Sequence, residues 1–358
     1  MNKFHFIQSI IASNFTRLTF PFKLSFAVTY KCNLRCRICN IWKKSSSFDE
    51  LNICELDRFF SQSRDFSWIS LTGGEPFLRT DLPQIVNRIL KYCTRLNTLH
   101  FATNGTLLPE IKEVLKTARK QNSSLTFAFT VSLDGPSGVH DTLRGVPGTW
   151  EKAVETFIYL KNISPQITAR LNFTLNAWNL DKFTAMWNAV KSRYPTLSFE
   201  DLSVNVFQKS DFFYDNPQAP DIAPGEILQA ISSILLLDKG RLSVNNFLRK
   251  TYLKLYKNYL DTDKSPLACK ALSSACFLDP YGNLYPCVMF NKKFGNIKNS
   301  SLNLAQLWQS EAAKQLRTEC VNNHCPSCWS PCDAYSAIAG SFWQAYQKAR
   351  NYHGPFKQ

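Results

Sequence analysis

The sequence lacks any run of about 18 apolar residues, so it predicts no membrane-spanning helix. Its N-terminus has no clean apolar stretch followed by a small-residue cleavage site, which argues against a secretory signal. Long polar low-complexity tracts are also missing, and the 44% hydrophobic and 13% aromatic content suffices for a packed core. These absences predict a folded cytoplasmic protein. At 358 residues it has room for one large domain and a small appendage.

Acidic residues are absent from residues 1–44, which carry eight Lys and Arg side chains in a chain of net charge +15. Such a segment can attract nucleic acid, anionic lipid or an acidic substrate, or it can form a solvated surface. Apolar residues lie near helical spacing between the basic ones: Phe4, Phe6, Ile7, Ile10 and Ile11. Segment 1–23 is therefore either a helix on an anionic membrane surface or, the commoner case, a helix docked on the protein's own core. No motif indicates specific nucleic-acid binding.

Short β-branched or aromatic runs alternate with longer amphipathic stretches as far as about residue 206. This pattern predicts an α/β fold in which six β/α units form a partial (β/α)6 barrel, with active-site loops at the carboxyl ends of parallel strands. The expected strands are 24–30, 68–72, 96–103, 125–133, 167–175 and 197–206.

Three further segments complete the expected organisation. The barrel domain should cover residues 24–222, and a helical linker residues 223–264. Residues 265–358 are rich in cysteine, with glycines, prolines and short spacings, which predicts a small metal-stapled module ending in a helix near 333–348.

Twelve cysteines gather mostly in two groups, and without a secretory signal this clustering favours metal ligation over disulfides. Cys32, Cys36 and Cys39 directly follow the first expected strand with the spacing C-x3-C-x2-C. Three thiolates in one loop can hold three irons of a cubane and leave the fourth iron open to a chelating ligand. A zinc knuckle completed elsewhere in the chain, or three reactive free thiols, would also fit the loop taken alone.

This spacing, with the apolar Ile38 before the last cysteine, resembles the signature of the radical S-adenosylmethionine (SAM) superfamily. Gly73, Gly74 and Glu75 are similar to that family's GGE motif, and residues 132–135 to its fourth-strand segment. The resemblance implies that SAM chelates the open iron of a [4Fe–4S] cluster and is reductively cleaved. It implies that the resulting 5′-deoxyadenosyl radical abstracts a substrate hydrogen, and that an external donor such as ferredoxin or flavodoxin supplies the electron.

Residues expected to bind SAM follow from the same resemblance: Ile38, Gly73, Gly74, Glu75, Ser132, Asp134 and Asn172. The glycines lack side chains, so the backbone can approach the methionyl amino group closely, and Glu75 could stabilise their turn. The polar strand residues would lie near the ribose or the methionyl carboxylate, or else serve as turn and capping groups. Arg144 could hold a carboxylate or form an ordinary salt bridge.

Seven further cysteines lie between residues 269 and 332. Their opening, Cys269 followed by Gly282 and Cys287, resembles the SPASM and Twitch modules of radical enzymes. The later cysteines do not reproduce a full SPASM run, so one auxiliary [4Fe–4S] cluster of the Twitch type is expected. Its expected ligands are Cys269, Cys287, Cys325 and Cys328, with Cys276, Cys320 and Cys332 as substitutes. A zinc ribbon is the alternative for this group.

The expected function is a radical enzyme that acts on a peptide or protein side chain, with the auxiliary cluster oxidising or binding the substrate. The same chemistry on a small molecule or sugar-like metabolite is nearly as well supported, because only 31 residues precede Cys32 and many peptide modifiers have a leader-binding domain there. An iron–sulfur electron carrier and a zinc-dependent nucleic-acid binder are remoter alternatives. Neither explains the Gly73-Gly74-Glu75 motif.

Overall fold

The computed structural model describes residues 2–44, 50–119, 125–240, 243–298 and 303–352. Met1 of the expected N-terminal segment and residues 353–358 of the expected C-terminal module lie outside these ranges.

Six parallel strands form the main sheet, and they lie side by side in chain order. They are β1 (Lys23–Thr29), β2 (Trp68–Gly73), β3 (Thr98–Thr103), β4 (Thr126–Ser132), β5 (Ile167–Leu175) and β6 (Leu202–Val206). Their apolar runs are buried, as Leu71, Phe101 and Phe173 show, because helices cover a parallel sheet. The expected six β/α units are confirmed.

The last strand begins later than expected. Ser198 and Asp201 form a reciprocal capping box that starts a 3-10 turn, η3 (Phe199–Asp201), ahead of β6.

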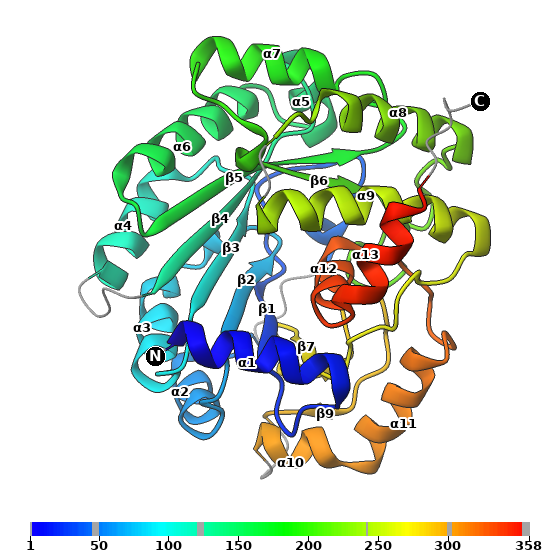
Figure 1. Cartoon of the computed structure of the whole chain (residues 1–358). Coiled ribbons are helices and arrows are strands. Elements are labelled where there is room, and N and C mark those ends of the chain that lie inside the picture. The colour runs from blue at the N-terminus through cyan, green and yellow to red at the C-terminus, as the bar shows by residue number, and fades with distance from the viewer. Residues whose placement is uncertain (1, 45–49, 120–124, 241–242, 299–302, 353–358) are drawn as a thin grey trace.

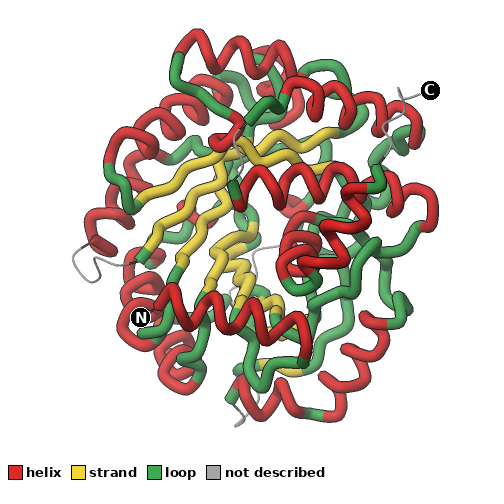
Figure 2. Tube along the Cα trace, viewed as in Figure 1, coloured by secondary structure: helices red, strands yellow, loops and turns green. Residues whose placement is uncertain are grey.

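Helices line the outer side of the strands in Figures 1 and 2. They are α2 (Ile53–Gln62), α3 (Leu82–Tyr92), α4 (Leu108–Arg119), α5 (Ser137–Arg144), α6 (Thr149–Ile163) and α7 (Phe183–Arg193). In α3 the buried residues Leu82, Ile85, Val86 and Ile89 recur at helical spacing, so one stripe faces the sheet. Short 3-10 turns, η1 (Ile41–Lys43) and η2 (Pro76–Leu78), follow the loops after β1 and β2.

The C-terminal strands extend the same sheet instead of forming a separate unit. They are β7 (Ala275–Leu278), β8 (Asn283–Tyr285) and β9 (Gly295–Asn296). Strand β7 lies parallel to β1, with Lys23 opposite Ala275 and Phe26 opposite Leu278. All four residues of β7 are buried, so β7 continues the apolar layer of β1.

The remaining helices of the C-terminal half are α8 (Pro224–Leu237), α9 (Val244–Thr262), α10 (Leu304–Gln309), α11 (Glu311–Val321), α12 (Pro331–Ala339) and α13 (Phe342–Arg350). The expectation of one closing helix over 333–348 was wrong. The segment divides at Gly340, which caps α12, and the backbone of Phe342 then donates to Asn14 Oδ1 at 3.2 Å. Helix α13 therefore takes a direction of its own, beside α1 (Asn2–Phe15).

Helix α1 covers the amino ends of the first strands. His5 Nδ1 lies 3.1 Å from Ser67 Oγ, just ahead of β2, and Phe6 packs against Phe22 and Trp68 with ring centroids 6.0 Å apart in each case. Among the described residues, no helix is long and apolar enough to cross a membrane.

Candidate active site and two groups of cysteine thiols

The loop after β1 brings the first three thiols together. Burial, with a smaller contribution from the neighbouring thiols, raises the pKa of the Cys32 thiol to about 11 and that of Cys39 to about 12. Burial also raises the pKa of Cys36, against the opposing effect of Arg144. Three buried thiols in one loop favour a ligand that stabilises thiolates, as iron does.

Two neighbouring segments hold this loop in place. Asn33 Oδ1 accepts a hydrogen bond from Asn104 Nδ2 at 2.8 Å, which joins the loop to the one after β3. On its other side, Asn216 Nδ2 donates to the Ile38 carbonyl at 2.7 Å, and Asn40 N donates to the Tyr214 carbonyl at 2.8 Å. Segment 210–216 was not assigned a role from the sequence, where it shows no motif.

Gly73 and Gly74 lie against the backbone that leads into the cysteine loop. A β carbon on Gly73 would stand 2.0 Å from the Thr29 carbonyl oxygen, and one on Gly74 would stand 2.2 Å from that of Lys31. Gly73 also has φ +132°, a conformation that side chains disfavour. The two glycines thus let the backbone after β2 lie against residues 29–31, and their expected approach to SAM stays a prediction.

Glu75 is fully buried and joins the loops after β2 and β3. Its Oε1 accepts from Thr103 Oγ1 at 2.8 Å, and its Oε2 accepts from Asn104 N at 2.7 Å. Burial raises the pKa of this carboxyl to about 7, although the hydrogen bonds oppose the shift. Glu75 therefore joins its turn to the loop after β3, and its expected part in SAM binding stays a prediction.

Asp134 and Arg144 form a buried ion pair beside Cys36. Arg144 Nη2 lies 2.6 Å from Asp134 Oδ2, and Arg144 Nη1 lies 3.8 Å from Cys36 Sγ. Burial alone would lower the pKa of Arg144, but Asp134 and Cys36 raise it above its ordinary value. The other Asp134 oxygen accepts from Thr174 N at 3.0 Å. The Asp134 carboxylate is thus engaged by the protein itself.

Ser132 and Asn172 lie opposite each other at the carboxyl ends of β4 and β5. Among the described residues, Asn172 Oδ1 has no hydrogen-bond partner although it is buried, and the same is true of Asn205 Oδ1 on β6. Arg144 Nε is likewise buried and unpartnered. Buried polar atoms normally have partners, so these orphaned groups fit a polar ligand at this end of the strands.

The second group of thiols surrounds Asp333. Burial raises the pKa of Cys269 to about 12, and burial also raises those of Cys287 and Cys328, with Asp333 next among the causes. Cys325 differs, because a hydrogen bond from Cys320 lowers its pKa below the ordinary value. The four expected ligands are therefore neighbours, and Cys320 belongs with them.

The other two substitute cysteines adjoin this group. Cys276 and Cys332 line one small pocket together with Cys287 and Asp333. Burial raises the pKa of both of these thiols. In the described part of the chain, no three His, Cys, Asp or Glu side chains converge as closely as one metal ion requires.

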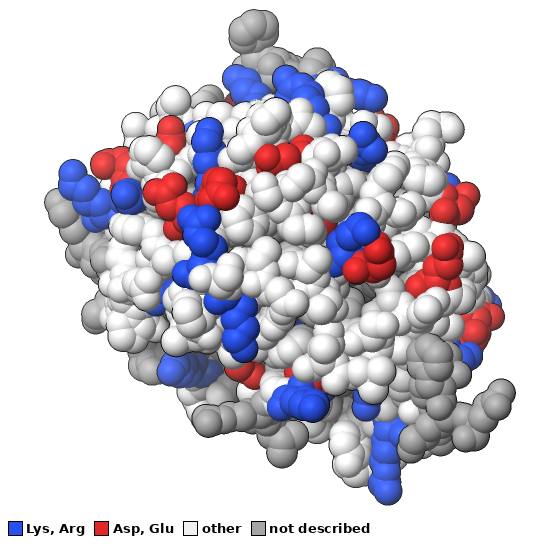
Figure 3. Space-filling view, turned by 90° about the horizontal axis from the view of Figure 1, so that it is seen from above, with Lys and Arg blue, Asp and Glu red and all other residues white. Residues whose placement is uncertain are grey.

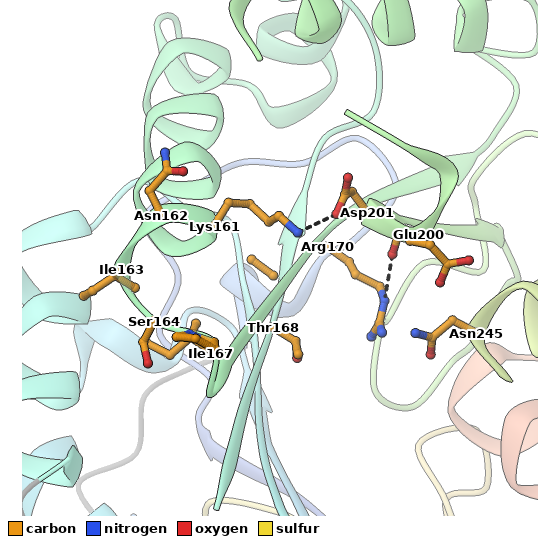
Figure 4. A pocket seen from close by; sticks show the side chains of 12 residues that line it. Lys161, Asn162, Ile163, Ser164, Ile167, Thr168, Arg170, Glu200, Asp201 and Asn245 are labelled. Atoms are coloured by element: carbon orange, nitrogen blue, oxygen red, sulfur yellow. Dashed lines mark hydrogen bonds and ion pairs between the residues drawn. The ribbon is translucent and has the colours of Figure 1, made fainter. Parts of the chain in front are cut away.

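A cavity of about 640 Å³ lies at the opposite end of β5, where Figure 4 shows Lys161, Arg170 and Asp201 around it. Lys161 Nζ pairs with Asp201 Oδ1 at 2.6 Å, and Arg170 Nε donates to the Glu200 carbonyl at 3.2 Å. Ligands of parallel sheets bind at the carboxyl ends of the strands. The cavity is therefore not the candidate active site.

Charged side chains of both signs are mixed on the face shown in Figure 3. Some of the basic side chains are paired, as Lys209 is with Asp221 at 2.6 Å and Lys182 with Asp181 at 2.7 Å. The net charge of +15 is thus not gathered into one basic patch on this face.

Comparison with known families decides what this arrangement is. Residues 26–181 match the profile of the Radical SAM superfamily, and residues 269–333 match the SPASM profile, an iron–sulfur cluster-binding domain. The chain belongs to the radical SAM superfamily. It is a radical SAM enzyme with a C-terminal SPASM domain, and its cofactors are SAM, a [4Fe–4S] cluster and SPASM auxiliary iron–sulfur clusters.

One relative is the antilisterial bacteriocin subtilosin biosynthesis protein AlbA of Bacillus subtilis. It is 23% identical to this chain, and the match covers 97% of this chain and 72% of AlbA. The AdoMet-dependent heme synthase of Nitratidesulfovibrio vulgaris is also 23% identical, with 90% of this chain and 88% of the synthase covered. The crystal structure of Streptococcus suis SuiB bound to its precursor peptide SuiA has a TM-score of 0.59 at 14% identity, over 88% of this chain and 70% of SuiB. This likeness supports the fold.

Proposed function

We propose that this radical SAM enzyme modifies a side chain of a peptide or protein. When bound, the cluster and SAM supply the radical chemistry that removes a hydrogen from the substrate. The observation that carries the proposal is the pairing of β7 with β1, because it joins the segment between Cys269 and Cys287 to the strand that leads into the first cysteine loop. A substrate between the two thiol groups would meet both.

Cys32, Cys36 and Cys39 are our proposed ligands of the SAM-binding cluster. Their support is the burial of all three thiols and the contacts that fix their loop. Cys269, Cys287, Cys325 and Cys328 are the proposed auxiliary ligands, with Cys320 close enough to replace one of them. We propose that these thiols hold one of the auxiliary clusters, with Cys276 and Cys332, which line a small pocket beside Cys287, as substitute ligands.

The cofactor-binding residues stay proposals as well. Arg144 has a free Nε and an ion pair with Asp134, so it can orient a carboxylate while Asp134 holds the guanidinium in place. Ser132 and Asn172 offer polar atoms at the same end of the sheet. Ile38 is half-buried beside Cys39 and can pack against a flat ring. Gly73 and Gly74 let the backbone after β2 lie against residues 29–31, just ahead of the cysteine loop. Glu75 joins the same turn to the loop after β3.

A peptide substrate is supported by the relatives AlbA, named for bacteriocin biosynthesis, and SuiB, solved with a precursor peptide. A small-molecule substrate is the second candidate, because the heme synthase relative is covered over 88% of its length. A ferredoxin or flavodoxin remains the proposed electron donor.

The experiment reconstitutes the protein anaerobically with iron and sulfide and incubates it with SAM, a strong reductant, and peptides encoded beside its gene. Mass spectrometry should find a peptide with altered mass together with 5′-deoxyadenosine. Cys32→Ala, Cys36→Ala and Cys39→Ala should each abolish both products, whereas Cys93→Ala, which removes a buried thiol outside the two groups, should not. Conversion of a heme precursor alone, with every peptide unchanged, would support the second candidate instead.

A further inference from the structure

Large apolar side chains are exposed on one connected part of the surface. Among the described residues, all but Val321 of these exposed side chains come from α1, from the end of α8, from the start of α9, or from α13. They are Phe4, Ile7, Ile11, Phe15, Leu236, Leu237, Val244, Phe342, Trp343 and Tyr346, which we call the apolar face. Figure 1 shows α1, α9 and α13 together on the side of the molecule nearest the viewer.

Helix α1 is apolar on two opposite sides. Its inner side carries Phe6 and Ser13, which contact the rest of the protein. Its outer side carries Phe4, Ile7, Ile11 and Phe15, spaced three or four residues apart, and Phe15 is 83% exposed. Docking of this segment on the protein's own core, the commoner case, explains the apolar residues on the inner side of α1. It does not explain the exposed ones on the outer side.

Contacts between the helices make the apolar face continuous. Asn14 of α1 donates through Nδ2 to the Ala339 carbonyl at 3.1 Å and accepts from Phe342 N at 3.2 Å, so α1 ends beside the start of α13. Phe342 in turn packs on Phe247 of α9, with ring centroids 4.9 Å apart. Trp343 and Tyr346 lie together on α13 with their ring centroids 5.9 Å apart.

The charged residues beside the apolar face indicate which kind of partner would cover it. Residues 2–15 and 342–350 contain no Asp or Glu, whereas they contain Lys3, Lys348 and Arg350. Between Leu236 and Val244 the single carboxylate is Asp238, which is buried and paired with Arg249 and Lys250. Exposed Phe and Ile beside Trp, Tyr and basic residues, without carboxylates, are typical of surfaces that lie in the interface of an anionic bilayer. We propose that the apolar face of α1 and α13 binds an anionic membrane surface.

The orientation is compatible with the radical chemistry. Helix α1 covers the amino ends of β1 and β2 through His5 and Phe6, whereas the cysteine loop follows the carboxyl end of β1. A membrane beneath α1 therefore leaves the mouth of the barrel open to substrate.

The test is flotation of the reconstituted full chain with vesicles of phosphatidylcholine alone and of phosphatidylcholine mixed with phosphatidylglycerol, at low and high salt. The expected result is binding to the mixed vesicles at low salt, weakened at high salt. Ile7→Gln with Ile11→Gln should reduce the bound fraction about tenfold, and Lys348→Gln with Arg350→Gln should reduce it severalfold. Val321→Gln is the matched control, an exposed apolar residue outside the face, and should bind like the unsubstituted protein.

Bromine-labelled lipids provide a second measurement, because they quench tryptophans at the bilayer interface. Quenching should fall markedly in Trp343→Phe, whose indole is 67% exposed. The proposal is overturned if the protein does not float with anionic vesicles at low salt, or if the Ile7/Ile11 variant floats as well as the unsubstituted protein. It is also overturned if that variant only turns a dimer into a monomer, since the face would then join two copies of this chain.

Discussion

Gly74 lies so close to Lys31 that a β carbon on Gly74 would stand 2.2 Å from the Lys31 carbonyl oxygen and 2.7 Å from that of Tyr30. The same two segments are joined by a hydrogen bond of 2.8 Å from Glu75 N to the Lys31 carbonyl. The glycine motif after β2 thus fixes the path of the backbone one residue before Cys32. The SAM-binding loop depends on the neighbouring strand for its shape.

Gly74→Ala should therefore displace Lys31 and with it Cys32, because backbone carbonyls cannot move aside as a flexible side chain can. We expect the reconstituted variant to lose the iron of the first cluster and to form no 5′-deoxyadenosine, while it keeps the iron of the second. Gly225→Ala is the control, since no atom lies within 4 Å of a β carbon there. A Gly74→Ala protein with full iron content would contradict this account.

Arg144→Met should destabilise the protein by roughly 3–5 kcal/mol, because it leaves the fully buried Asp134 carboxylate without its partner. Urea unfolding of the protein without iron measures this change apart from cluster loss. Arg193→Met removes an exposed ion pair with Glu151 at 2.8 Å and should cost only about 0–1 kcal/mol.

A second substitution tests the cause. Asp134→Asn combined with Arg144→Met should recover part of the lost stability, since no buried charge then remains uncompensated. If the double variant is as unstable as the two single effects added together, the ion pair is not the reason for the loss.

The raised pKa of Glu75 predicts that the unfolding free energy of the protein depends on pH. Burial raises its pKa from the ordinary 4.5 to about 7, so the folded state binds this proton more tightly than the unfolded state does. The contribution of Glu75 to stability is therefore fully present below pH 4.5 and is lost as the pH rises towards 7. The difference in unfolding free energy between the unsubstituted protein and Glu75→Gln should decline over that range. A difference that is constant from pH 4.5 to 7 would show that the carboxyl is charged throughout.

The six strands were predictable because their signals are local. Each is a short buried run, and β5 spans Ile167–Leu175 as the sequence predicted. The pairing of Lys23 with Ala275 was not predictable, because it joins segments far apart in the chain, and nothing in a four-residue apolar run names its partner. The break at Gly340 depends on contacts with Ser13 and Lys270, which are equally remote.

In the candidate site, too, the local features were predictable from the sequence and the contacts between distant segments were not. Motif spacing located Cys32, Gly74 and Glu75, since each lies in a loop that directly follows a strand. It could not show that Asp134 would be engaged by Arg144, or that Asn216 would hold the Ile38 carbonyl. Those partners depend on how separate loops meet, and a single Asn or Arg has many ordinary uses.

The last prediction concerns the division of labour between the two thiol groups. Cys269→Ala or Cys287→Ala should keep substrate-independent cleavage of SAM, because the first thiols lie in a different loop with contacts of their own, but should form no product. Iron should fall by about four atoms, the content of one [4Fe–4S] cluster. Cys93→Ala is the matched control, since this buried thiol at the end of α3 lies outside both groups and its variant should keep its iron.

Folding must be followed by circular dichroism, because a small metal-supported region can unfold when a ligand is removed. Here β7 belongs to the main sheet beside β1, so the variants should stay folded and the two activities should separate. If folded Cys269→Ala lost about four irons and still converted substrate normally, the auxiliary cluster would have only a structural role. If folded Cys269→Ala lost SAM cleavage as well, the first cluster would depend on the second group of thiols, contrary to our proposal.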